Sequence, residues 1–152
     1  MRKLLMVASL AFVLSNCSSS KKVVATQQGV DFVQSEKLMS VLEMAGNKEK
    51  LVFVDFYTTW CLPCKMMDED VFPDKGISKL FNDNFISYKI DAEKGNGPNL
   101  ALIYQVQAFP TLLFLDKDGK VLVRKEGAAY HSELRSLAEE AMAASSAANL
   151  GE

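Results

Sequence analysis

The hydrophobic positions of the chain change period several times, and these changes separate predicted helices from predicted strands. Between residues 35 and 45, apolar side chains recur at the i, i+3, i+4, i+7 spacing of one helix face, and Ser35 is a suitable N-cap. Residues 51–57 (LVFVDFY) are mostly apolar, β-branched or aromatic, which indicates a strand buried on both faces. Residues 85–90 give a second strand. The buried face of the first helix is predicted to consist of Leu38, Val41, Leu42 and Ala45.

Further helices are predicted around these strands. The pattern is helical over residues 61–70, and Pro73 then interrupts it. It is helical again over residues 77–81. Asn99 is a suitable N-cap for a helix over residues 100–104.

The last third of the chain predicts a hairpin followed by a helix. Residues 111–115 (TLLFL), the turn at 116–119 (DKDG) and residues 120–124 have the pattern of a β-hairpin. Ser132 opens a final helix, which we expect to fray after Ala143. Strands that alternate with helices predict parallel pairing, and the hairpin adds antiparallel strands at one side. The fold class predicted is therefore α/β with a central mixed sheet.

Composition restricts the class of protein further. With 152 residues, 49% of them hydrophobic and 24% charged, the chain fits one globular domain and is unlike a disordered or multi-span membrane protein. The formal net charge is -2, and no concentrated basic run indicates a nucleic-acid partner. Three cysteines are too few for a disulfide-stapled scaffold, so a chemical role is expected of them.

The first residues have the pattern of a secretion signal. A basic start at residues 1–3 precedes an apolar run at residues 4–14, which is too short to cross a bilayer as a helix. The following Leu-Ser-Asn-Cys ends at Cys17 and resembles a bacterial lipoprotein box, in which the cysteine receives the lipid. The alternative is an ordinary signal cut near Ser15, which leaves Cys17 as a free thiol.

These observations predict the organisation of the chain. Residues 1–16 are expected to be a lipoprotein-type signal peptide, and residues 17–30 the lipidated cysteine and a polar tether. Residues 31–145 are expected to form the folded domain, and residues 146–152 a disordered tail. The expected location is the periplasmic side of the cell envelope, lipid-anchored to a membrane, where disulfides persist.

The segment Trp60-Cys61-Leu62-Pro63-Cys64-Lys65 carries the candidate chemistry. Two cysteines separated by two residues at the start of a helix can close a small disulfide. Unpaired N–H groups and the helix dipole stabilise a thiolate at Cys61, which predicts that Cys61 attacks and that Cys64 resolves the mixed disulfide. Pro63 is tolerated in the first turn because its missing N–H has no helix partner there.

Asp55 lies in the apolar strand that leads into this segment. A buried carboxylate is costly, and burial should raise its pKa, so that Asp55 can take a proton from Cys64. The alternative is a solvated aspartate at a strand edge.

Phe109-Pro110-Thr111 precedes the hairpin. A proline entering a strand marks a strand start, an edge or a cis turn. If the bond is cis, Pro110 can pack beside the cysteines, and the backbone of Phe109 can pair with an extended substrate segment.

The segments VDFYTTWCLPCK at residues 54–65 and FPTLLFLDKDG at residues 109–119 resemble the thioredoxin family, and the likeness covers about residues 35–142. The resemblance implies a thioredoxin fold, with helices on both faces of the sheet. It implies catalytic roles for Cys61, Cys64 and Asp55. Substrate contacts are then expected at the flanking ring and at the prolines, which are Trp60, Pro63, Phe109 and the cis-proline Pro110.

Three features depart from plain thioredoxin. Leu62 replaces a glycine, Phe109 replaces a smaller residue, and the stretch 68–85 is longer. This stretch resembles the C-terminal domain of the periplasmic reductase DsbD and its lipoprotein relatives, which favours reduction of substrates. Whether Lys89 takes the place of the lysine that thioredoxin sets against its buried aspartate is left open.

Other functions compete with this interpretation. A zinc site needs four ligands, and Cys61, Cys64 and the distant His131 do not supply them, so neither a metal nor a cofactor is expected. The second function class is a tethered binding or adaptor module of the same fold with a structural disulfide. The favoured hypothesis is a monomeric thiol-disulfide oxidoreductase that acts on protein disulfides with a thiol electron donor.

Overall fold

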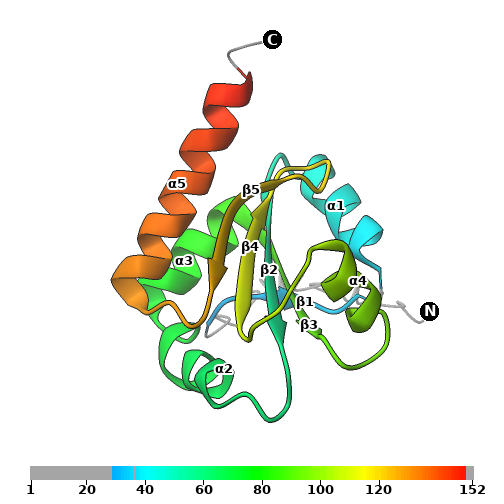
Figure 1. Ribbon diagram of the computed structural model, residues 1–152. Helices are drawn as coiled ribbons and strands as arrows, with labels where there is room; N and C mark the ends of the chain where they lie inside the picture. Colours follow the sequence, from blue (N-terminus) through cyan, green and yellow to red (C-terminus); the bar gives the residue numbers. More distant parts are fainter. Residues whose placement is uncertain (1–28, 36, 150–152) are drawn as a thin grey trace, which may run out of the picture.

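A five-stranded mixed sheet forms the centre of the molecule in the computed structural model, which describes residues 29–35 and 37–149 (Figure 1). The strand order is β1-β3-β2-β4-β5, with β1, β2 and β3 parallel to one another. The β4 and β5 strands pair as an antiparallel hairpin, and β4 runs antiparallel to β2. The bounds are Phe32–Val33 for β1, Leu51–Tyr57 for β2, Phe85–Asp91 for β3, Thr111–Leu115 for β4 and Val121–Glu126 for β5. The mixed sheet predicted from the sequence is confirmed.

Helices cover both faces of this sheet, as Figure 1 shows. One face carries α1 and α4, and the other carries α3 and α5, while α2 lies at the end of β2. The bounds are Leu38–Asn47 for α1, Leu62–Met66 for α2, Met67–Val71 for the π-helical turn η1, Lys75–Asn84 for α3, Gly97–Ile103 for α4 and His131–Asn149 for α5. The thioredoxin fold implied by the resemblance is therefore present.

The central strand β2 divides the core in two because successive side chains point to opposite faces. Val52, Val54 and Phe56 pack with α1 on one face. Phe53 lies in a phenylalanine-rich cluster on the other, with ring contacts to Phe81 at 4.8 Å between centroids. All positions from 52 to 56 are buried, as the apolar run predicts. Asp55 therefore lies in a strand that is buried on both faces, and its side chain points to the same face of the sheet as Phe53.

Two predicted helix starts are wrong. Ser35 does not cap α1, which begins at Leu38, because the Ser35 hydroxyl instead accepts from the backbone N–H of Lys37 and donates to its carbonyl. Asn99 lies inside α4, which begins two residues earlier at Gly97. Pro98 fits the first turn of that helix, and a side chain at position 97 would collide with the carbonyl of Asp91.

The C-terminal end also differs from expectation. The helix α5 continues to Asn149, so the predicted fraying after Ala143 is wrong, while the predicted tail over residues 146–152 stays a prediction. Alanine has the highest helix propensity, and it sustains the segment beyond its last buried residue, Ala141. The helix packs against the sheet through Leu134, Ala138 and Ala141, which are buried.

The N-terminal predictions are not tested by the structure. The signal peptide 1–16, Cys17 and most of the tether lie outside the described residues. Within residues 29–35 and 37–149, no helix combines the length and apolar character that a membrane span requires.

Candidate active site

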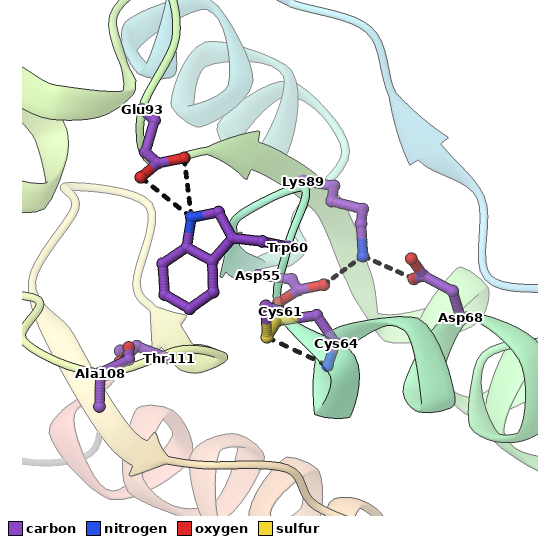
Figure 2. The surroundings of a disulfide bond; sticks show 9 residues. All are labelled: Asp55, Trp60, Cys61, Cys64, Asp68, Lys89, Glu93, Ala108 and Thr111. Atoms are coloured by element: carbon purple, nitrogen blue, oxygen red, sulfur yellow. Dashed lines mark hydrogen bonds and ion pairs between the residues drawn. A yellow bond between two sulfur atoms is a disulfide. The ribbon is translucent and has the colours of Figure 1, made fainter.

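The cysteine pair lies where β2 leads into α2. Cys61 has extended backbone geometry and is the N-cap of the helix, while Pro63 stands in its first turn. Cys61 and Cys64 form a disulfide with their Cα atoms 5.4 Å apart. The backbone N–H of Cys64 donates to the Cys61 sulfur at 3.2 Å (Figure 2). A free helix N–H is thus directed at Cys61, where it would stabilise negative charge on the reduced sulfur.

The outer side of the disulfide is a rim of exposed apolar side chains. Both cysteines are buried, at 3% exposure for Cys61 and 1% for Cys64, whereas Trp60 and Leu62 are 65% and 67% exposed. A partner that approaches the disulfide therefore meets these side chains first. We call the exposed Trp60 and Leu62, together with the half-buried Phe109, the outer rim.

Trp60 is held in position from two sides. Its indole N–H donates to both carboxylate oxygens of Glu93 at 3.1 Å (Figure 2). Its ring also meets the ring of Phe109 edge-on, with centroids 6.0 Å apart. The indole is therefore ordered although most of it faces solvent.

The Phe109-Pro110 peptide bond is cis, in agreement with the resemblance. Pro110 is buried, and its carbonyl accepts from the backbone N–H of Gly127 at 2.8 Å. Thr111 begins β4, and its hydroxyl donates to the carbonyl of Ala108 at 2.7 Å. Figure 2 shows Ala108 and Thr111 on one side of the disulfide and Asp68 with Lys89 on the other.

Asp55 lies on the inner side of the disulfide. It is 1% exposed, and its Oδ2 accepts from the Lys89 ammonium at 2.6 Å. Its other oxygen, Oδ1, is buried without a hydrogen-bond partner. Burial raises the pKa of the Asp55 carboxyl, and the neighbouring Lys89 opposes this only in part. The alternative of a solvated aspartate at a strand edge is wrong.

Lys89 is the partner that the sequence left open. It is in register with Asp55 on the neighbouring strand β3. Its ammonium donates a second hydrogen bond, 2.5 Å long, to Asp68 in η1. Burial alone would lower the pKa of Lys89, but Asp55 and Asp68 outweigh it and raise the pKa, so the side chain is charged.

Sequence reasoning missed two contributors to this site. Asp68 follows Cys64 by four residues in one helical segment, a spacing that places side chains on the same face and could have indicated it. Glu93 lies in the loop after β3, and no local pattern indicates its contact with Trp60.

The described residues give no sign of a metal site. His131 is exposed at the start of α5, and its Nε2 lies 3.1 Å from the carbonyl of Asp70. Among residues 29–35 and 37–149, no three histidine, cysteine, aspartate or glutamate side chains are arranged to hold an ion.

Comparisons with known proteins agree with the geometry. The family profile described as a thioredoxin-like domain matches residues 38–142. The chain is 43% identical over 86 residues to chloroplastic thioredoxin Y2 of Arabidopsis thaliana, a match that covers 57% of this chain and 48% of that protein. It is 33% identical over 98 residues to a thioredoxin of Buchnera aphidicola, covering 64% of this chain and 85% of the relative.

A solved structure extends the likeness to three dimensions. The solution structure of a putative disulphide-isomerase from Bacteroides thetaiotaomicron superposes with a TM-score of 0.68 at 38% identity, over 76% of this chain and 94% of that one. By contrast, the chain spans only about half the length of the Arabidopsis thioredoxin that it matches.

Proposed function

The chain belongs to the thioredoxin-like domain family, and from that premise we propose that it is a thiol-disulfide oxidoreductase whose Cys61 and Cys64 alternate between dithiol and disulfide. The observation that carries the proposal is the Cys61-Cys64 disulfide at the start of α2, with the helix N–H of Cys64 directed at the Cys61 sulfur. A sulfur in this position is the better nucleophile because its thiolate is stabilised.

The proposed reaction reduces a protein disulfide in two exchanges. The Cys61 thiolate attacks one substrate sulfur, so that the substrate disulfide breaks and a mixed disulfide forms, while the other substrate sulfur leaves as a thiolate. Cys64 then attacks the Cys61 sulfur and releases the second substrate thiolate. The substrate gains two electrons, and Cys61 and Cys64 become a disulfide, which a thiol electron donor reduces again.

Asp55 supplies the base in the second exchange. Cys64 must lose its proton before it attacks, and Figure 2 shows the Asp55 carboxylate between the cysteines and Lys89. Its free oxygen Oδ1 can accept that proton. The raised pKa of Asp55 brings its proton affinity closer to that of a thiol, which makes the transfer less unfavourable.

The outer rim and the two prolines receive the substrate. Trp60 and Phe109 offer aromatic surface beside the disulfide, and aromatic side chains contribute strongly to protein contacts. The backbone of Phe109, ahead of the cis Pro110, can pair with an extended segment that carries the substrate disulfide, while Pro63 borders Cys64.

The direction and location form a second part of the proposal. The resemblance of residues 68–85 to DsbD-type reductive relatives is a prediction from the sequence alone, and from it we infer that the protein reduces its substrates. From the lipoprotein-like segment ending at Cys17 we infer lipid anchoring on the periplasmic side of the cell envelope, and we propose that the protein is a monomer.

Insulin reduction in the presence of dithiothreitol tests the reaction. We expect Cys61→Ser to abolish catalysis and Cys64→Ser to accumulate mixed disulfides with substrate. Cys17→Ser is the matched control, since it also replaces one cysteine by serine but leaves the reaction intact, and in cells it should release the protein from membranes. Full activity in Cys61→Ser would overturn the mechanism.

A tethered adaptor with a structural disulfide is the second candidate. The burial of both cysteines in the oxidised form favours it. In that case neither Cys61→Ser nor Cys64→Ser would change the low rate at which dithiothreitol alone reduces insulin.

A further inference from the structure

The Lys89 ammonium lies between two carboxylates of unequal exposure. It donates to Asp55 at 2.6 Å and to Asp68 at 2.5 Å (Figure 2). The side chain of Asp55 is 1% exposed and that of Asp68 is 42% exposed. One ammonium therefore links a carboxylate in the core to a carboxylate at the surface.

Aromatic rings hold Lys89 in this position. Its nitrogen lies 4.7 Å from the centroid of Tyr57, 5.2 Å from that of Phe72 and 5.6 Å from that of Phe32. A cation over aromatic faces is attracted to them, and side-chain exposure of 18% leaves Lys89 little freedom to turn away. Loss of either carboxylate should thus leave Lys89 close to the other.

The charged and titratable groups around Asp55 come from each element packed against it. The β3 strand contributes Lys89 and η1 contributes Asp68, and Figure 2 shows Cys61 and Cys64, at the start of α2, beside Asp55. On the other side, β4 places the apolar Leu112 in register with Asp55. Tyr57 of β2 also approaches this cluster, and its ring lies against the Lys89 ammonium.

The two neighbours act on Asp55 in opposite directions. Burial is the largest influence and raises the pKa of Asp55, Lys89 lowers it, and the negative charge of Asp68 raises it. Asp68 therefore counteracts part of the stabilisation that Lys89 gives to the ionised carboxylate.

We propose that Asp68 is a positioning residue for the exchange reaction, because it shares the Lys89 ammonium and so keeps Asp55 able to hold the proton that Cys64 releases. The inference rests on the proposed function. In the second exchange, the Cys64 proton passes to Asp55, the new thiolate forms a bond to the Cys61 sulfur, and the substrate sulfur leaves with the electron pair of the broken bond. Asp68 and Lys89 keep their protonation states throughout.

Stopped-flow release of thionitrobenzoate from 5,5′-dithiobis(2-nitrobenzoate) isolates this step. The reduced protein releases one thionitrobenzoate when Cys61 attacks and a second when Cys64 displaces it, so the pH dependence of the second phase follows the base. We expect Asp68→Asn to move the acid limb of that profile to lower pH and to slow the plateau several-fold, because Asp55 becomes a weaker base. Lys89→Gln should move the limb to higher pH.

Glu69→Gln is the matched control, since it removes a negative charge from the same π-helical turn at an exposed position beside Asp68. Its profile should coincide with the wild-type profile. An Asp68→Asn limb that stays in place, or that moves to higher pH as in Lys89→Gln, would overturn the inference.

A titration of the Asp55 carboxyl carbon by NMR in the oxidised protein provides a readout without catalysis. The Asp55 midpoint should fall in Asp68→Asn, rise in Lys89→Gln and stay unchanged in Glu69→Gln. Absence of any second phase in the wild type would contradict the proposed function instead, and the NMR midpoints would still decide the role of Asp68. Circular dichroism shows whether each variant is folded.

Discussion

The two sides of the disulfide differ in burial and in charge. On the outer side, Trp60 and Leu62 are exposed, and Trp60 is fixed by a carboxylate at the surface. On the inner side, Asp55 is buried and linked through Lys89 to Asp68. Polar groups are thus placed where water is excluded, and apolar groups where water is present.

This inversion of the usual distribution indicates a division of tasks. Exposed apolar surface is available for a partner to cover, whereas a buried carboxylate is costly unless it is paired or used. Changes on the outer side should therefore alter how tightly a substrate binds, and changes on the inner side should alter proton transfer and its pH dependence.

Among changes on the inner side, Asp55→Asn should impair proton transfer from Cys64 most strongly. The amide cannot take the Cys64 proton, so we expect the second exchange to slow by about 10²-fold and its acid limb to disappear. Stopped-flow release of thionitrobenzoate measures this rate, and the first phase, which depends on Cys61, should change far less. A variant with wild-type rate in the second phase would remove Asp55 from the mechanism.

The same substitution should stabilise the fold. At neutral pH, Asn removes a buried charge that has one unpartnered oxygen, for an expected gain of about 1–3 kcal/mol, while Lys89 keeps Asp68 as its partner.

The gain should depend on pH in a defined way. Since the pKa of Asp55 is raised in the folded state, the folded wild type binds more protons than the unfolded chain once pH exceeds the ordinary value of 3.8, and it loses stability as pH rises. Urea unfolding of the oxidised proteins should show a larger free energy of unfolding for Asp55→Asn than for the wild type at pH 7. This difference should disappear below pH 3.8. An advantage that grows as pH falls would contradict the burial argument.

Trp60→Ala should show the complementary effect on the outer side. We expect KM for a protein disulfide to rise about tenfold with kcat little changed, because an exposed tryptophan that a partner covers contributes more than 1 kcal/mol to binding. Leu102→Ala, a truncation of another exposed apolar side chain, on α4, serves as the control. A fall in kcat with unchanged KM would assign Trp60 to the chemistry instead.

Glu93→Gln should give the smallest effect. Its amide oxygen can still accept from the Trp60 N–H, but the hydrogen bond to a charged group is lost, and such bonds are stronger than neutral ones. We expect a rise in KM of about two- to fivefold, corresponding to less than 1 kcal/mol. Insulin kinetics measure it, and a larger effect than that of Trp60→Ala would show that Glu93 contacts the substrate directly.

Local pattern predicted much of the fold and part of the site. The apolar run at 51–57 and the hairpin turn are strong signals because they depend on few neighbouring residues. The two-residue strand β1 is too short to carry any pattern. Ser35 and Asn99 are plausible caps in isolation, but the Ser35 hydroxyl bonds to the backbone of Lys37 outside the helix, and Gly97 and Pro98 start α4 before Asn99.

The remaining parts of the site depend on register, which sequence alone leaves undetermined. Lys89 meets Asp55 because β2 and β3 pair these residues directly, and a slip of one residue would turn Lys89 to the opposite face. The contacts of Asp68 and Glu93 join segments 21 and 33 residues apart. The cis bond before Pro110 was expected through family resemblance and not through its own residues.

The difference in reactivity between the two sulfurs tests the central claim most directly. The protein is reduced, treated briefly with iodoacetamide at pH 7, and the labelled peptides are quantified by mass spectrometry. We predict that Cys61 is alkylated at least about tenfold faster than Cys64, because the helix N–H groups stabilise its thiolate. Equal and slow labelling of both cysteines would contradict the account and favour a structural disulfide.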